Sequence, residues 1–133
     1  MVIEADEVWA ERIRAGGVTD VTIAASAEVV RHVLAGLGKA GARFGVILVD
    51  GVEPRSEYLE DAARLVSEDG LLVVDNSDRE RYGAALASLH DWHRFDFFGL
   101  GPQNAYAWAT SIFSRQAIAP RGRRESFKRS IEY

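Results

Sequence analysis

Two short apolar runs, each closed by an acidic residue, constrain the fold more than any other feature of this sequence. Phe44–Val49 is followed by Asp50, and residues 71–74 are followed by Asp75 and Asn76. Short continuous apolar runs bounded by turn residues are typical of strands that are covered on both faces of a parallel sheet. The sequence therefore predicts a sheet with helices on both sides.

Helical segments are expected between these strands. Asp6 and Ser26 are candidate N-caps of helices, and residues 18–24 between them, rich in β-branched side chains, are expected to form a strand. Residues 54–67 and 77–92 have apolar side chains at helical spacing and predict two further helices. The alternation of strands and helices predicts an α/β fold with a mostly parallel sheet.

The last part of the sequence changes pattern. Residues 94–98 and 107–114 are expected to be strands, and the loop between them is too short for a crossover helix. This spacing predicts an antiparallel strand pair at the end of the sheet. We expect one α/β domain over residues 1–118, followed by a basic, poorly ordered tail over residues 119–133.

Composition narrows the class of protein. The chain has 133 residues, 47% of them hydrophobic and 27% charged, which is typical of one soluble globular domain. A net charge of −4 argues against nucleic acid as a partner, and no apolar run is long enough to span a membrane. The absence of cysteine excludes a disulfide framework and fits a cytoplasmic location. Composition leaves the oligomeric state open.

Polar residues follow the predicted strands at their carboxyl ends, where open parallel sheets bind their ligands. An acidic residue there can hold the hydroxyls of a ribose, and carboxylates with an amide can hold a divalent cation or orient a polar substrate. The simpler alternative is that Asp50 and Asp75 only cap the helices that follow them. The residues at the predicted strand ends are Glu4, Ala25, Ser26, Asp50, Asp75 and Asn76.

Four segments, taken in order, resemble the class I S-adenosylmethionine-dependent methyltransferases. V-I-E-A-D-E-V-W-A-E-R-I-R (residues 2–14) is similar to their second strand and following helix. F-G-V-I-L-V-D-G (44–51) and G-L-L-V-V-D-N-S-D-R-E-R-Y (70–82) are similar to their fourth and fifth strands. Residues 95–115, with the sequence T-S-I-F, are similar to their closing antiparallel pair. The resemblance covers residues 2–115.

This resemblance implies a fold, a cofactor and a site. The fold is a Rossmann-like three-layer sandwich, and the cofactor is S-adenosylmethionine. Glu4 would bind the adenosyl ribose, with Ala25, Ser26 and Asp50 beside the cofactor. Asp50 with Asp75 and Asn76 would form the catalytic side, which transfers the methyl group to a small-molecule acceptor that the sequence does not identify.

The family fold also has a first strand and a glycine-rich loop before the acid that matches Glu4, and only three residues precede Glu4 here. Residues 36–41 match G-x-G-x-x-G, but they close a helix instead of opening one, so they are interpreted as a turn. We therefore expect an incomplete, N-terminally truncated domain with weak cofactor binding. The alternative is a non-catalytic Rossmann-like remnant that acts as a binding or assembly module.

A metal-dependent variant of the site is a further alternative. Asp50, Asp75 and Asn76 are similar to the ligands of cation-dependent catechol and caffeoyl-coenzyme A O-methyltransferases, in which Mg²⁺ activates the acceptor oxygen. Those enzymes carry a lysine near the first acid, and residues 51–55 contain none. In the metal-free alternative, Asp50 and Asn76 line the acceptor pocket together with Asp78 and Arg55. A nicotinamide oxidoreductase is disfavoured because no tyrosine has a lysine four residues later.

Overall fold

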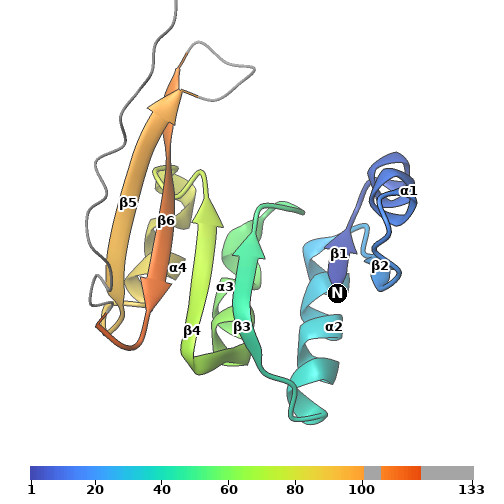
Figure 1. Cartoon of the computed structure of the whole chain (residues 1–133). Helices are drawn as coiled ribbons and strands as arrows, with labels where there is room; N and C mark the ends of the chain where they lie inside the picture. The colour runs from blue at the N-terminus through green and yellow to red at the C-terminus, as the bar shows by residue number, and fades with distance from the viewer. Residues whose placement is uncertain (101–105, 118–133) are drawn as a thin grey trace, which may run out of the picture.

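The computed structural model describes residues 1–100 and 106–117, and it shows a mixed α/β chain (Figure 1). The expected basic tail, residues 119–133, lies outside the described residues, as does most of the loop between the last two strands. Within the described residues, no helix is long and apolar enough to cross a membrane.

The described strands form two sheets instead of the single sheet expected. A parallel pair, β1 with β2, is separate from a four-stranded sheet of order β3-β4-β6-β5. In the larger sheet β3 is parallel to β4, whereas β6 is antiparallel to both β4 and β5, which confirms the predicted antiparallel pair. The strands are β1 (Val2–Glu4), β2 (Val21–Ile23), β3 (Phe44–Val49), β4 (Val66–Asp75), β5 (His93–Leu100) and β6 (Ala107–Ser114).

The first two helices follow the prediction closely. α1 (Glu7–Ala15) begins after Asp6, whose carboxylate accepts the backbone N–H groups of the helix's first turn at 2.8 and 3.1 Å. α2 (Ala27–Lys39) begins after Ser26, whose hydroxyl oxygen accepts the N–H of Val29 at 3.4 Å. These side chains satisfy N–H groups that a helix leaves unpaired at its start. Gly36 and Gly38 lie in α2, which confirms that the glycine-rich motif closes a helix, although the predicted turn begins only after Lys39.

The two later helices are shorter than predicted. In place of a helix over residues 54–67, a 3₁₀ turn at Arg55–Glu57 leads into α3 (Leu59–Leu65), and β4 already begins at Val66. In place of a helix over residues 77–92, α4 comprises only Gly83–Ala87, preceded by a 3₁₀ turn at Glu80–Tyr82.

Tertiary hydrogen bonds explain why the second of these helices starts late. The backbone N–H of Ser77 donates to the carbonyl oxygen of Ala109 at 2.9 Å, and the carboxylate of Asp78 accepts the N–H of Ala109 at 2.9 Å. Ser77 and Asp78, which stand at the start of the predicted helix, therefore bind strand β6 and are unavailable as N-caps.

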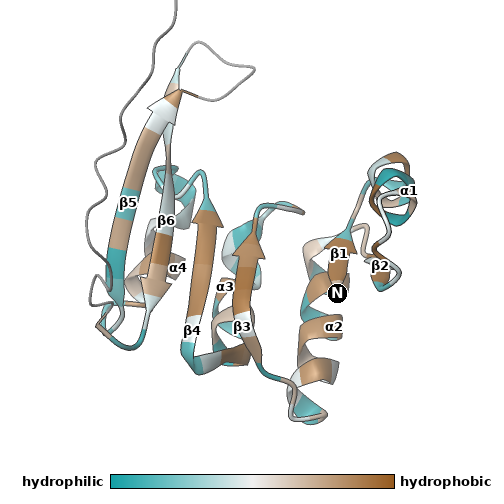
Figure 2. Cartoon of the chain, in the orientation of Figure 1, coloured by the Kyte–Doolittle hydropathy of each residue, from teal (hydrophilic) through white to brown (hydrophobic). Residues whose placement is uncertain are grey.

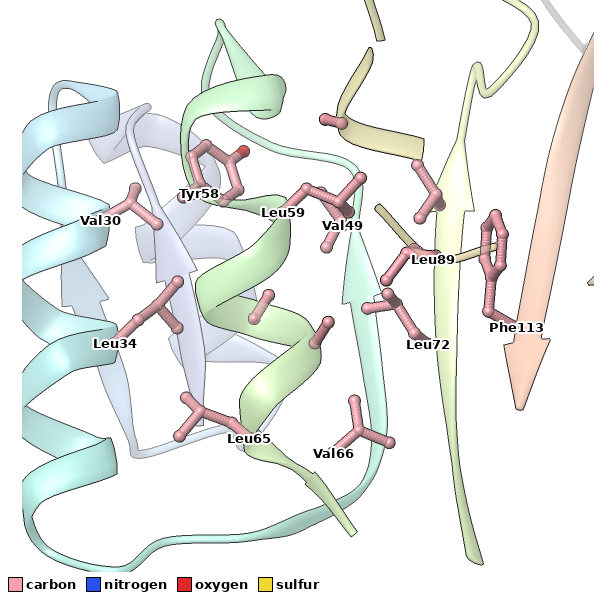
Figure 3. Close-up of a cluster of buried hydrophobic side chains, with 14 of the residues drawn as sticks. Val30, Leu34, Val49, Tyr58, Leu59, Leu65, Val66, Leu72, Leu89 and Phe113 are labelled. Atoms are coloured by element: carbon pink, nitrogen blue, oxygen red, sulfur yellow. The ribbon is translucent and has the colours of Figure 1, made fainter. Parts of the chain in front are cut away.

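The core lies on one face of the larger sheet. α2, α3 and α4 contribute buried side chains that meet those of β3, β4 and β6, among them Leu34, Leu65, Leu72 and Phe113 (Figure 3). The opposite face is open at β3, where the side chains of Val46 and Leu48 are 61% and 63% exposed. The expectation that β3 is covered on both faces is therefore wrong for the described residues, although β3 is strongly apolar (Figure 2).

Candidate functional site

Acidic side chains follow three parallel strands at the same edge of the fold. Glu4 ends β1, Asp50 follows β3, and Asp75 ends β4 (Figure 1). Val49 pairs with Val74, so the register between β3 and β4 places Asp50 beside Asp75. Neither aspartate caps a helix, because the first turn after each is 3₁₀ and begins several residues later. The predicted placement of these residues at strand ends is confirmed.

Arg55 joins the ends of β3 and β4. Its guanidinium donates to the backbone oxygens of Asp50 at 2.9 Å, Gly51 at 3.2 Å and Asp75 at 2.7 Å. It also donates to the Asp50 carboxylate at 3.2 Å and to the side-chain oxygen of Asn76 at 3.4 Å. The residue is 7% exposed, so a buried cation with five acceptors connects the two strand ends. A planar guanidinium suits this task because its donors form a fixed fork.

The backbone at Asn76 turns through the left-handed region, with φ of 53°. Asparagine tolerates this conformation better than other residues with a side chain, apart from aspartate. The turn directs the chain from the end of β4 to Ser77, which binds β6. Asn76 therefore has a backbone role as well as a side chain that faces Arg55.

The two aspartates have different surroundings. Asp75 accepts a hydrogen bond from the Thr110 hydroxyl at 2.6 Å, which fixes its carboxylate against β6. The side chain of Asp50 is 55% exposed. Partial burial raises the pKa of Asp50; the Arg55 guanidinium opposes this rise, and the neighbouring Asp75 carboxylate adds to it. Asp50 is thus an accessible carboxylate with raised proton affinity.

A second acid, Glu53, lies beyond Arg55. One carboxylate oxygen of Glu53 accepts from Arg79 at 3.1 Å, from Arg81 at 2.9 Å and from the hydroxyl of Tyr82. Burial raises the pKa of Glu53, but the hydrogen bonds from Tyr82, Arg81 and the backbone of Arg55 outweigh burial and hold its pKa below the ordinary value. Glu53 is therefore a structural anion that joins the loop after β3 to the loop after β4.

The proposed cofactor residues are only partly brought together. Glu4 Oε1 accepts the N–H groups of Ala5 at 2.8 Å and Asp6 at 3.0 Å, which fixes the carboxylate and leaves Oε2 without a hydrogen bond in the described residues. The end of β1 lies near the end of β3, because the Ile3 carbonyl oxygen is 4.0 Å from the point where a Gly51 Cβ would stand. Ala25 and Ser26 are exposed at the end of β2, and the Ser26 hydroxyl is already the cap of α2.

The donor set does not fit the magnesium alternative. The oxygens of Asp50 and Asn76, which would be ligands, instead accept hydrogen bonds from Arg55. A guanidinium next to the would-be ligands repels a divalent cation. The arrangement supports the metal-free alternative, in which Arg55 belongs to the site.

The sequence pattern did not reveal the role of the charged residues that follow the two apolar strands. Arg55 appeared only as one lining residue, and Glu53, Arg79 and Arg81 were not singled out. The available signal was the position of all four in the segments that directly follow the two apolar strands. Charged residues at such positions have either to reach solvent or to pair with one another.

No protein-family model matches this chain, and no curated protein matches it either. The resemblance to methyltransferases therefore rests on the motifs of this chain.

Proposed function

We propose that this chain is a Rossmann-like S-adenosylmethionine-dependent methyltransferase domain that acts on a small-molecule acceptor. The observation that carries the proposal is the alignment of Glu4, Asp50 and Asp75 at the ends of β1, β3 and β4. Open α/β sheets bind ligands at this edge. The order β3-β4-β6-β5, with its antiparallel end, also agrees with what the resemblance implies for the second half of the fold.

Each acid has a distinct task in this proposal. Glu4, with one oxygen fixed by backbone N–H groups, would accept hydrogen bonds from the ribose hydroxyls. Asp50, exposed and with a raised pKa, would bind the acceptor hydroxyl and take its proton. Asp75 and Asn76, fixed by Thr110 and Arg55, would hold the acceptor in line. The cofactor supplies an electrophilic methyl group on a sulfonium centre.

The proposal assigns no metal to this site, because Arg55 already supplies the positive charge between the two strand ends. We propose that this buried guanidinium stabilises negative charge on Asp50 and on the acceptor oxygen. The acceptor is thus expected to be oriented by side chains alone. The proposed location is the cytoplasm, which a chain without cysteine fits.

Calorimetric titration with S-adenosylhomocysteine tests the cofactor assignment. We expect weak but saturable binding that is insensitive to added Mg²⁺. Glu4→Gln should weaken binding by about 10- to 150-fold, because a hydrogen bond to a charged group is worth about 1.5–3 kcal/mol. Glu7→Gln is the matched control, since Glu7 lies on the exposed surface of α1 and carries the same chemical change.

Two results would contradict the proposal. One is the absence of binding by a chain whose circular dichroism shows it to be folded. The other is equal weakening by Glu4→Gln and Glu7→Gln, which would mean that binding does not use the end of β1. A strong requirement for Mg²⁺ would restore the metal alternative and remove Arg55 from its proposed role.

A second candidate function is a non-catalytic binding module. It is favoured by one observation: among residues 1–100 and 106–117, β1 and β3 each have one edge without a partner strand, and an apolar cavity lies between them. A folded chain that does not bind S-adenosylhomocysteine but binds a polypeptide would support this function over methyl transfer.

A further inference from the structure

Two arginines beyond Arg55 share a single acid. Arg79 and Arg81, the arginine pair, follow the end of β4, and each donates to the same carboxylate oxygen of Glu53, at 3.1 and 2.9 Å. Among the residues that the structure describes, Glu53 is the only acid in a salt bridge with either arginine. Two positive charges are therefore set against one negative charge.

This Glu53 oxygen has more donors than it can serve. Besides the arginine pair it accepts the hydroxyl of Tyr82, and the Nε atom of Arg55 lies 3.8 Å away. A carboxylate oxygen has about two lone pairs, so it cannot bind all these donors well. Within residues 1–100 and 106–117, the guanidinium groups of the pair have no acceptors except Glu53 and the Tyr82 hydroxyl. Most of their N–H donors therefore face solvent or a ligand.

The arginine pair is accessible, unlike Arg55. The side chains of Arg79 and Arg81 are 37% and 55% exposed, whereas that of Arg55 is 8% exposed and binds the two strand ends. The guanidinium carbon of Arg81 also lies 5.2 Å from the centre of the Tyr82 ring, which orients its donors before a ligand arrives. The pair can thus exchange partners, and Arg55 cannot.

The arginine pair lies next to the proposed acceptor site. Arg55 stands between two acids, with Nη2 3.2 Å from the Asp50 carboxylate and Nε 3.8 Å from that of Glu53. One guanidinium group therefore separates Asp50 from Glu53 and its two arginines. Burial raises the pKa of Asp50, and the charge of Arg55 and, more weakly, that of Arg79 oppose the rise. The charge of Arg79 thus acts at Asp50.

The geometry of the pair selects an oxyanion. Neither arginine forms a two-pronged pair with Glu53, because both use Oε1 while Oε2 accepts the backbone N–H of Arg55 at 3.3 Å. The planar fork of each guanidinium is therefore incomplete. Carboxylate and phosphate groups match such a fork, since they present two oxygens side by side. A neutral polar group offers neither this match nor the missing charge.

We propose that the acceptor carries a carboxylate or phosphate group, which Arg79 and Arg81 bind while the acceptor hydroxyl lies at Asp50. This inference rests on the proposed methyl transfer and names its substrate class, small hydroxyl compounds with an oxyanion. The bound anion would balance the charge of the arginine pair. Because the acceptor is then held at two points, its hydroxyl has a fixed orientation at Asp50.

Binding of small oxyanions to the full chain tests the subsite. Inorganic phosphate and acetate are titrated separately at constant ionic strength, and NMR follows the Nε–Hε signals of the arginine side chains. We expect saturable shifts at Arg79 and Arg81, and the anion that binds more tightly distinguishes a phosphate from a carboxylate. Acetamide has the shape of acetate without its charge and should cause no shift.

Substitutions in the arginine pair test its role. Arg79→Gln and Arg81→Gln should each weaken the tighter anion by about fivefold, as expected for an exposed ion pair. Arg79→Lys should recover part of this affinity, because lysine keeps the charge and loses the fork. Arg64→Gln is the matched control at an exposed arginine that pairs with Glu60 and Asp61, and should change the affinity less than about twofold. Circular dichroism checks that each variant is folded.

A further variant tests whether the subsite adjoins Asp50. Asp50→Asn removes a negative charge beside Arg79 and should tighten anion binding by about twofold. Asp91→Asn is the same change at a side chain that is 87% exposed and precedes β5, and should have no effect. Equal affinities of the Asp50→Asn variant and the unchanged chain would place the anion away from the acceptor site and overturn the proposal.

Three other outcomes would overturn the proposal. One is the absence of saturable shifts at Arg79 and Arg81 in the folded chain, and another is equal weakening by Arg64→Gln. If S-adenosylhomocysteine binds in either case, the proposed methyl transfer stands and only the oxyanion is lost. The third is anion binding by a chain that does not bind S-adenosylhomocysteine, which would remove the assignment of the anion to a methyl acceptor.

Discussion

Arg55 donates to Asp50 twice, to its backbone oxygen at 2.9 Å and to its carboxylate at 3.2 Å. The same guanidinium reaches the backbone oxygen of Asp75, 2.7 Å away across the gap between two strands. A side chain from the loop after β3 therefore holds the carboxyl ends of β3 and β4 together. The position of the exposed Asp50 carboxylate depends on this buried cation.

Removal of Arg55 should be costly. Arg55→Ala would remove the guanidinium donors from the backbone oxygens of Asp50 and Asp75 and the positive charge between two carboxylates. We expect a loss of about 3 kcal/mol in the free energy of unfolding, measured by urea denaturation. Arg55→Lys should recover part of this loss, because an ammonium group cannot reproduce the planar fork of donors.

Arg64→Ala is the control for this prediction. Arg64 is exposed and forms helix-surface ion pairs with Glu60 at 3.3 Å and Asp61 at 2.8 Å. Such pairs contribute little, so we expect a change below about 0.5 kcal/mol. Equal losses for Arg55→Ala and Arg64→Ala would mean that Arg55 does not hold the strand ends together.

Glu53 makes stability depend on pH. Burial raises its pKa, but hydrogen bonds from Tyr82, Arg81 and the Arg55 backbone outweigh burial and hold the pKa in the folded chain below the ordinary glutamate value of 4.5. Its contribution to stability is therefore present above pH 4.5 and is lost as the pH falls through the lower folded-state pKa. Glu53→Gln should reduce the free energy of unfolding at neutral pH.

The wild-type chain and Glu53→Gln should be compared by urea denaturation from neutral pH to below pH 4.5, where their difference should shrink. Asp50 has a raised pKa, so its contribution to stability changes with pH in the opposite direction. Asp50 is present in both chains, so the difference between them reports the contribution of Glu53. Glu57→Gln, the same change at an exposed position, is the control. A difference that is constant with pH would show that Glu53 is not a structural anion.

The parts of the fold that depend on local sequence could be predicted. α1 and α2 were placed correctly because a capping side chain and a helical apolar pattern lie within the segment itself. The ends of α3 and α4 could not be predicted in the same way. β4 begins at Val66 because Val66 pairs with Phe44 of β3, ahead of an irregularity in register before Leu71. The second helix starts late because Ser77 and Asp78 bind β6. Both effects come from segments distant in the sequence.

The site was predictable to a similar degree. Parallel strands bring their carboxyl ends to one edge, so Glu4, Asp50 and Asp75 could be grouped from the strand pattern alone. The role of Arg55 could not be predicted in this way. Its five acceptors come from the ends of two strands, and Asp75 is 20 residues away from Arg55 in the sequence. Nor does the pattern reveal that a helix layer is absent over Val46 and Leu48 in the described residues.

Asn76 separates a backbone effect from a side-chain effect. Its φ of 53° costs a residue with a Cβ about 1 kcal/mol, and asparagine offsets part of this cost by local hydrogen bonding. Asn76→Ala should therefore lower the free energy of unfolding by about 1 kcal/mol. Asn76→Gly should lower it less, because glycine adopts this conformation freely and only the 3.4 Å contact with Arg55 is lost. Equal losses in the free energy of unfolding of the two variants would mean that the loss comes from the Asn76 side chain and not from its backbone conformation.

Gly70 lies close to β3, in the irregular stretch of β4 between Val66 and Leu71. A Cβ at Gly70 would stand 2.8 Å from the Ser67 hydroxyl oxygen, 2.8 Å from a Val66 methyl carbon and 2.9 Å from the Gly45 carbonyl oxygen. The backbone contact cannot relax without moving β3, so Gly70→Ala should destabilise the chain by about 1–3 kcal/mol in urea denaturation.

Gly36→Ala is the matched substitution inside α2, where nothing lies within 4 Å of the new Cβ. Because alanine is the better helix former, we expect Gly36→Ala to stabilise the chain by about 0.5–1 kcal/mol. Opposite signs for one chemical change would show that packing between β3 and β4 decides the outcome at Gly70, and the same sign at both positions would contradict this.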